Sequence, residues 1–132
     1  MRRFFILLGF SCLFVSLAHA EADLDPDQLA VLRVQPLLRG RCMACHGDDA
    51  NKIKGGYDMR EREGLYGGGD SGSIAIVPQK PEESPLYLSV NRAHEDWEAM
   101  PPKASDSLDK REIAWLRDWI AGGHRGRMRR SA

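Results

Sequence analysis

The sequence Cys42-Met43-Ala44-Cys45-His46 contains more information about the fold than any other stretch of the chain. Two thiols three positions apart, followed directly by an imidazole, form the attachment pattern of a c-type haem. Each thiol can form a thioether bond to one vinyl group of a porphyrin, and the histidine that follows is then held close to the ring as a ligand of the iron. We therefore predict one covalently attached haem c, with Cys42, Cys45 and His46 as its attachment residues.

Two other interpretations of the spacing between Cys42 and Cys45 are weaker. A redox-active dithiol of the thioredoxin type occurs among alternating strands and helices, and this chain does not have that pattern. A structural zinc site needs two further ligands at short spacing, and the sequence does not offer them. The adjacent His46 favours haem attachment over both.

The first twenty residues have the composition of a secretory signal peptide. Arg2 and Arg3 precede an apolar run over residues 4–17, and Ala18-His19-Ala20 supplies a cleavage site. The run is shorter than the roughly 20 apolar residues that span a bilayer, so we expect no transmembrane anchor after cleavage. Cys12 lies in a poor context for a lipoprotein. We predict a periplasmic or otherwise exported protein, which agrees with haem attachment outside the cytoplasm.

Cleavage after Ala20 would leave one small domain at 21–123 and a basic tail at 124–132 that we expect to be flexible. The two remaining cysteines do not make a disulfide scaffold. Without Arg2 and Arg3 the chain has 17 basic and 19 acidic residues, and four of the basic ones lie in the tail. This asymmetry either attracts a charged partner or only solubilises the surface. We expect a monomer with redox partner proteins and no nucleic-acid partner.

Apolar residues recur at helical spacing near both ends of the domain. In 27–41 they predict a helix that starts at Asp25-Pro26 and is kinked or broken at Pro36. Towards the C-terminus, Asp106 or Ser107 is the predicted cap of a second helix. The apolar face of that helix, and the glycines that end it, are Ile113, Trp115, Leu116, Trp119, Ile120, Gly122 and Gly123.

The middle of the chain gives weaker signals. The glycine-rich stretch 47–80 predicts tight turns instead of helix, with an extended segment at 73–78. Residues 84–91 start with Ser84-Pro85, which favours a helix, but their apolar positions alternate as in a strand. Helix and strand are therefore evenly weighted there.

A haem iron that is bound by one histidine has a sixth position, and Met100 is our candidate for it. Met100 lies in Glu98-Ala99-Met100-Pro101-Pro102, where two prolines restrict the backbone that presents the sulfur. A thioether favours ferrous iron and raises the reduction potential, whereas the alternative role of such a methionine is to fill a gap in the core. Weaker candidates for the sixth ligand are Met59, His94, His124 and Met128.

Haem would also contribute to the stability of so small a domain. Burial of apolar surface stabilises a fold by roughly 25 cal/mol per Å², and a porphyrin has two apolar faces. We therefore predict that the haem-free chain is largely unfolded. The residues expected to cover the ring are Leu37, Leu38, Val77, Leu88, Leu116, Trp119 and Ile120.

Together these residues resemble the planctomycete-type cytochrome c domain, a divergent relative of the small monohaem class I cytochromes. The resemblance covers about residues 29–123. One departure is Pro78-Gln79-Lys80-Pro81, since the family tends to place glycine after the first proline. The matching motifs include Val34-x-Pro36-Leu37-Leu38, Cys42-x-x-Cys45-His46-Gly47, Gly55-Gly56-x-Asp58-x-Arg60, Ile76-Val77-Pro78, Pro81-x-x-Ser84-x-Leu86-Tyr87, Met100-Pro101-Pro102 and Trp119-Ile120.

The resemblance implies a mainly α, cytochrome c-like fold in which N- and C-terminal helices pack around a covalently bound haem, with a long glycine-rich loop. It also implies that His46 is the proximal ligand and Met100 the distal one. The implied function is an exported monohaem cytochrome that carries single electrons by Fe(II)/Fe(III) cycling and is not itself an enzyme. Two alternatives are a haem-containing binding or assembly module, and an enzyme or gas sensor with one open iron position.

Overall fold

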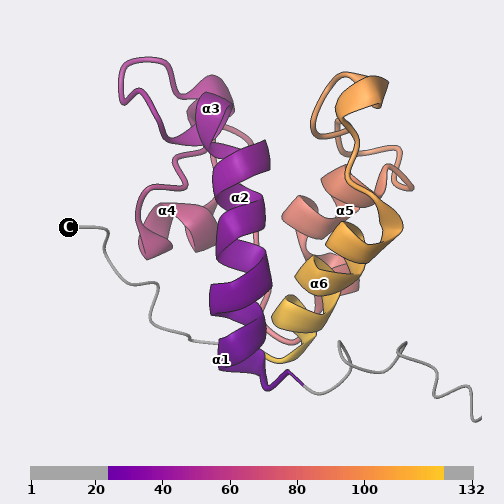
Figure 1. The fold of residues 1–132 in the computed structure, drawn as a ribbon. Helices are drawn as coiled ribbons and strands as arrows, with labels where there is room; N and C mark the ends of the chain where they lie inside the picture. Colours follow the sequence, from indigo (N-terminus) through magenta and orange to yellow (C-terminus); the bar gives the residue numbers. More distant parts are fainter. Residues whose placement is uncertain (1–23, 124–132) are drawn as a thin grey trace, which may run out of the picture.

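The computed structural model describes residues 24–123. The predicted signal peptide at 1–20 and the predicted tail at 124–132 therefore lie outside the described residues. Within residues 24–123 the chain forms helices and turns and no strand, as Figure 1 shows. The prediction of a mainly α fold is confirmed.

The N-terminal helix is one continuous rod made of α1 (Pro26–Leu29), the π-helical η2 (Ala30–Val34) and α2 (Gln35–Arg41) (Figure 1). Asp25 caps it, as predicted, by accepting hydrogen bonds from the backbone of Asp27 and Gln28. The Gln28 side chain in turn accepts from the backbone N–H of Asp25 at 3.1 Å, which completes a capping box.

Pro36 widens the rod and does not break it. The backbone N–H of Gln35 bonds to the carbonyl of Ala30, five residues back, which is the pattern of a π-helix. Because proline has no N–H, the usual hydrogen-bond ladder cannot pass through position 36. The predicted irregularity is therefore present as a wide turn within a continuous helix.

Seven further helical elements follow the rod in the described part of the chain. They are α3 (Met43–His46), η3 (Lys54–Gly56), α4 (Arg62–Gly67), η4 (Pro81–Glu83), α5 (Pro85–Asn91), η5 (Ala104–Asp106) and α6 (Lys110–Ala121).

The helix α4 corrects the prediction that 47–80 holds turns only. It buries Leu65 completely, and apolar burial of this kind can stabilise a single helical turn despite glycine at 64 and 67. Gly64 is needed there for space, since a Cβ atom at this position would collide with the carbonyl oxygen of Asp58. The segment 73–78 has no regular secondary structure and forms no strand.

Residues 85–91 form a helix, α5, which decides between the two predicted alternatives. Ser84 precedes it and is fully buried, but its hydroxyl does not cap the helix. Instead Ser84 Oγ accepts from the backbone N–H of Val77 at 2.9 Å and donates to the carbonyl of Lys80 at 2.8 Å. The side chain thus fixes the glycine-rich segment to the start of α5.

The prediction that Asp106 or Ser107 caps the C-terminal helix is wrong. The cap of α6 is Asp109, whose carboxylate accepts from the backbone of Arg111 and Glu112. Glu112 accepts in return from the backbone N–H of Asp109 at 2.9 Å, so a reciprocal capping box sets the start of the helix. The predicted end is confirmed, because Gly122 is the C-cap.

The core lies where the C-terminal helix meets the N-terminal rod. Helix α6 packs against α1, η2 and α5, and the rod and α6 diverge towards α3 (Figure 1). No helix in residues 24–123 has both the length and the apolar character needed to cross a membrane. The most deeply buried apolar side chains are Val34, Leu65, Ile76, Leu116 and Ile120.

Candidate haem-binding site

The two thiols and the imidazole share one face of a short helical turn. Cys42 ends α2, and its carbonyl accepts hydrogen bonds from the backbone N–H of Cys45 at 3.1 Å and of His46 at 3.0 Å. Residues separated by three or four positions on a helix lie on the same side of it. Cys42, Cys45 and His46 accordingly line one cavity.

This cavity has a volume of about 820 Å³, within the roughly 300–1,000 Å³ that is usual for small-molecule and cofactor sites. It brings together all four predicted site residues, because Met100, in the segment after α5, lines it as well. Its mainly apolar lining suits a flat, hydrophobic ring, although Arg41, Lys54, Glu98, Lys103 and Asp106 also line it. The lining residues besides these four include Ala44, Tyr57, Met59, Val90, Pro101, Pro102 and Leu108.

A hydrogen bond to the backbone orients His46. Its Nδ1 atom lies 3.1 Å from the carbonyl oxygen of Tyr57. Since a carbonyl oxygen can only accept, Nδ1 carries the proton and the lone pair of Nε2 is left for a metal ion. An imidazole in this tautomer is suited to bind iron.

Tyr57 also stabilises this side of the cavity through its own side chain. The hydroxyl donates to the carbonyl of Leu65 in α4 at 2.7 Å, and the ring lies 5.4 Å from that of His46. Burial, followed by the neighbouring Cys42 thiol, raises the pKa of Tyr57 well above its usual value, so the hydroxyl remains a neutral donor. Tyr57 is not among the predicted site residues, because no short-range pattern in the sequence links it to His46.

The thiols at the site are free, and both are half-buried. Burial raises the pKa of Cys42 from 9.0 to about 11, although the adjacent Arg41 acts in the opposite direction. The thiol is therefore protonated at neutral pH and is not a reactive thiolate. This disfavours the redox-dithiol interpretation of the motif.

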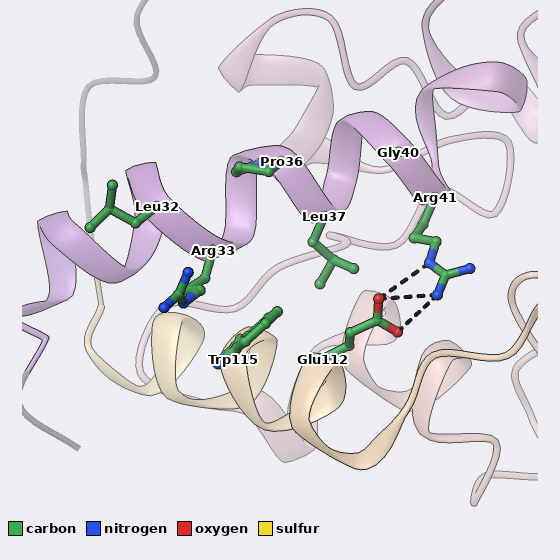
Figure 2. A pocket seen from close by; sticks show the side chains of 8 residues that line it. All are labelled: Leu32, Arg33, Pro36, Leu37, Gly40, Arg41, Glu112 and Trp115. Carbon is green, nitrogen blue, oxygen red and sulfur yellow. Dashed lines mark hydrogen bonds and ion pairs between the residues drawn. The ribbon is translucent and has the colours of Figure 1, made fainter. Parts of the chain in front are cut away.

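An ion pair connects the haem motif to the C-terminal helix. Arg41, directly before Cys42, makes three hydrogen bonds to the carboxylate of Glu112 in α6, at 3.1 to 3.3 Å (Figure 2). The Arg41 side chain is 42% exposed, so solvent screens the pair and we expect it to contribute about 0.5 kcal/mol. Figure 2 also shows Arg33 above Trp115, with the guanidinium carbon 5.4 Å from the ring centre.

Met100 reaches the cavity from the segment that follows α5. Its backbone N–H donates to the carbonyl of Ser89 in α5 at 3.1 Å, and its side chain is half-buried against the core. A thioether at this position is a soft donor that binds iron well. The structure thus places a thioether side chain in the same cavity as the imidazole of His46.

Met59 lines the cavity as well and is only 7% exposed. Its backbone N–H donates to the carbonyl of His46 at 2.8 Å, which places the Met59 backbone beside the histidine. Two axial ligands of a haem lie on opposite faces of the ring, so this position disfavours Met59 as the partner of His46.

Of the remaining candidate ligands, His94 lies in the described part of the chain and is not at the site. His94 is exposed, does not line the cavity, and accepts a hydrogen bond from the backbone of Asp96 at 3.2 Å. His124 and Met128 lie outside the described residues. Among residues 24–123 no three His, Cys, Asp or Glu side chains are grouped so that they could hold a metal ion.

The residues expected to cover the ring are not the ones that line the cavity. Leu37, Leu38, Leu116, Trp119 and Ile120 are buried in the core between the helices. The remaining two, Val77 and Leu88, are half-buried, and Leu88 packs against this core. The sequence identified these positions as apolar, but it could not distinguish the helix faces that meet each other from those that face the cavity.

The donor set and the lining fit a haem. Two free thiols on one helical turn can form the two thioether bonds, and His46 and Met100 supply an imidazole and a thioether to one cavity. The charged residues that line the cavity are exposed, and its buried lining residues Met59, Val90 and Leu108 are apolar, so the inner part of the ring would meet apolar surface.

Comparison with known families agrees with this chemistry. Residues 42–104 match the sequence model of the family described as Planctomycete cytochrome C (PSCyt1). The matched span begins at Cys42 and contains His46 and Met100. Comparisons with curated proteins and with solved structures give no match. Residues 42–104 are therefore similar to the planctomycete cytochrome C family, in agreement with the resemblance noted in the sequence.

Proposed function

We propose that the protein is an exported monohaem c-type cytochrome that carries single electrons between redox partner proteins. The observation that supports this most is the single cavity lined by two thiols, a histidine with a free Nε2 and a methionine. A haem bound there would supply an iron that exchanges one electron between its ferrous and ferric states.

In this proposal each site residue has one task. Cys42 and Cys45 hold the cofactor covalently, so that a domain of this size does not have to enclose it completely. His46, oriented by the Tyr57 carbonyl, binds from one side of the ring. Met100 would supply a thioether to the iron, which would favour the ferrous state and raise the reduction potential.

The two axial ligands distinguish a carrier from an enzyme or a gas sensor. An enzyme that acts on a haem-bound substrate, or a sensor that binds a gas, needs one open position on the iron. If His46 and Met100 both bind, no position is open, and the coordination changes little when an electron enters or leaves. The cytochrome c family of residues 42–104 fits a carrier of this kind.

The remaining parts of the proposal concern the fold and the compartment. The packing of α6 against the N-terminal rod supports a cytochrome c-like fold in which the haem lies where the two diverge. Export is supported by the basic, apolar and small-residue pattern of residues 1–20 and by the family.

The test is a potentiometric titration of the matured protein together with carbon monoxide binding. We expect a reversible one-electron transition and no rapid binding of carbon monoxide by the ferrous protein. Rapid binding would contradict the carrier and favour an enzyme or a sensor. A haem that exchanges no electrons across the potential range of respiratory proteins would favour the binding or assembly module.

A further inference from the structure

Helix α5 ends at an arginine in a backbone conformation that favours glycine. Arg92, the C-cap of α5, has φ 55° and ψ 22°, which is the left-handed region. Glycine is preferred at the ends of helices in this conformation because it has no Cβ atom. The arginine is therefore unfavourable for the backbone, and contacts of its side chain can offset this disadvantage.

The side chain of Arg92 contacts the segment that carries Met100. Its Nη2 group donates to the carbonyl oxygens of Pro101 and, at 3.1 Å, of Lys103. The guanidinium thus holds the two peptide groups on the C-terminal side of the methionine.

The segment depends on an outside donor because of its own sequence. Pro101 and Pro102 have no backbone N–H, so this part of the chain cannot be held through donated hydrogen bonds. It can be fixed only through its carbonyl groups or through the residue before the prolines. The Met100 N–H bonded to Ser89 and the guanidinium of Arg92 supply these two contacts, both from the end of α5.

The Arg92 side chain is half-buried where it meets the Met100 segment. Its Nε atom is buried and has no hydrogen-bond partner, which is unfavourable by itself. The bonds from Nη2 to the two carbonyls are the contacts that can offset this disadvantage.

We propose that Arg92 is a positioning residue for the distal ligand, which keeps the Met100 segment closed over the cavity. This inference rests on the proposed function, because it requires that Met100 binds the haem iron. Arg92 itself does not line the cavity and acts only through the Met100 segment. Loss of its hydrogen bonds lets the segment open more often, so an external ligand replaces the methionine faster.

The experiment measures how fast cyanide displaces the methionine from the ferric, haem-loaded protein, followed by loss of the long-wavelength absorption band of the iron–thioether bond. For Arg92→Gln we expect displacement about ten times faster than in the unchanged protein, as the loss of a charge-assisted hydrogen bond implies. Arg92→Lys should lie between the two, because an ammonium keeps the charge but not the planar, two-pronged geometry.

Two further variants separate positioning from general stability. Arg92→Gly relieves the left-handed backbone but removes the donors, so we expect fast displacement without a lower unfolding temperature. Arg39→Gln makes the same type of change on the exposed face of α2 and should leave the rate unchanged. Unfolding temperatures are measured for every variant.

The outcomes distinguish the two levels of the proposal. If the unchanged protein lacks the iron–thioether band, the proposed function fails at Met100 and this inference fails with it. If the band is present but Arg92→Gln and Arg92→Gly exchange at the rate of the unchanged protein, the positioning role of Arg92 is overturned and the proposed function stands. Equal acceleration by Arg39→Gln would overturn it too. If Arg92→Gln cannot be loaded with haem, Arg92→Lys and Arg92→Gly decide by the same criterion.

Discussion

The two sides of the cavity are built in different ways. On the Cys42–His46 side, one helical turn aligns the ligands through hydrogen bonds between residues three and four positions apart. On the Met100 side, the ligand lies in a proline-rich segment that is held by residues of α5 about ten positions away. We therefore expect the attachment at Cys42 and Cys45 to be permanent and the ligand at Met100 to be exchangeable.

This difference predicts where the domain opens. Local unfolding occurs first in segments with few backbone hydrogen bonds of their own. The Met100–Lys103 segment has two prolines without N–H groups, whereas the Cys42–His46 turn continues the rod almost without interruption. We therefore expect the distal side to open while the proximal side stays formed.

Removal of both thiols should have the largest effect. In Cys42→Ala/Cys45→Ala we expect no covalent haem and a loss of most helical circular dichroism, because the cavity loses the group that fills it. Arg39→Gln, matured in parallel, is the control for expression and handling. A double variant with the helical spectrum of the haem-loaded protein would contradict the prediction.

The pH dependence of Cys42 tests the same point in the haem-free chain. In the fold, burial raises the pKa of Cys42 from 9.0 to about 11, so the folded thiol holds its proton more tightly. A haem-free fold would therefore lose stability as the pH rises from 9.0 towards 11. Because we expect this chain to be largely unfolded, thiolate absorbance of a haem-free Cys45→Ala variant should rise near pH 9.0. A midpoint near 11 would show that the fold forms without haem.

Substitution on the distal side should change the potential but not the attachment. In Met100→Ala we expect covalent haem to remain, the iron–thioether band to disappear and the potential to fall by on the order of 0.1 V. Met59→Leu is the matched control, since it removes the other thioether of the cavity and keeps its volume. Loss of the band in Met59→Leu, with Met100→Ala unchanged, would assign the distal position to Met59.

The smallest effect is expected for Tyr57, whose backbone carbonyl oxygen bonds to the proposed proximal histidine, His46. Tyr57→Phe removes the hydrogen bond to the Leu65 carbonyl and leaves the ring, and we expect a loss of about 1 kcal/mol in the free energy of unfolding. The band and the potential should hardly change, because His46 is oriented by the backbone of residue 57 and not by its hydroxyl. Denaturant unfolding and potentiometry measure the two effects. A large fall in potential would mean that the hydroxyl also orients His46.

The Cys42–His46 side of the cavity could be predicted from the sequence, because its geometry follows from the spacing of the three residues alone. The position of Cys42, Cys45 and His46 on one helical face follows from three and four residues of separation. The start of α6 was missed, although Asp109-x-x-Glu112 is a capping-box pattern that the sequence contains. The predicted caps, Asp106 and Ser107, come earlier in the chain but do not form a reciprocal pair with a residue three positions later, as Asp109 does with Glu112.

The Met100 side of the cavity, which depends on contacts between distant residues, was predicted only in part. Two prolines after Met100 indicated a restricted segment, but nothing in the sequence pairs it with Arg92. That contact depends on the left-handed turn at the end of α5, where glycine would be expected. The helix α4 was not predicted, because Gly64 is also a typical turn residue in sequence. In the structure this glycine allows the Asp58 carbonyl to approach the helix.

The most direct test of the account is the intact mass of the matured protein. We predict a single species whose mass exceeds that of the polypeptide by one haem, with the addition located on the peptide that contains Cys42 and Cys45. A correctly matured polypeptide without this addition would contradict the central claim.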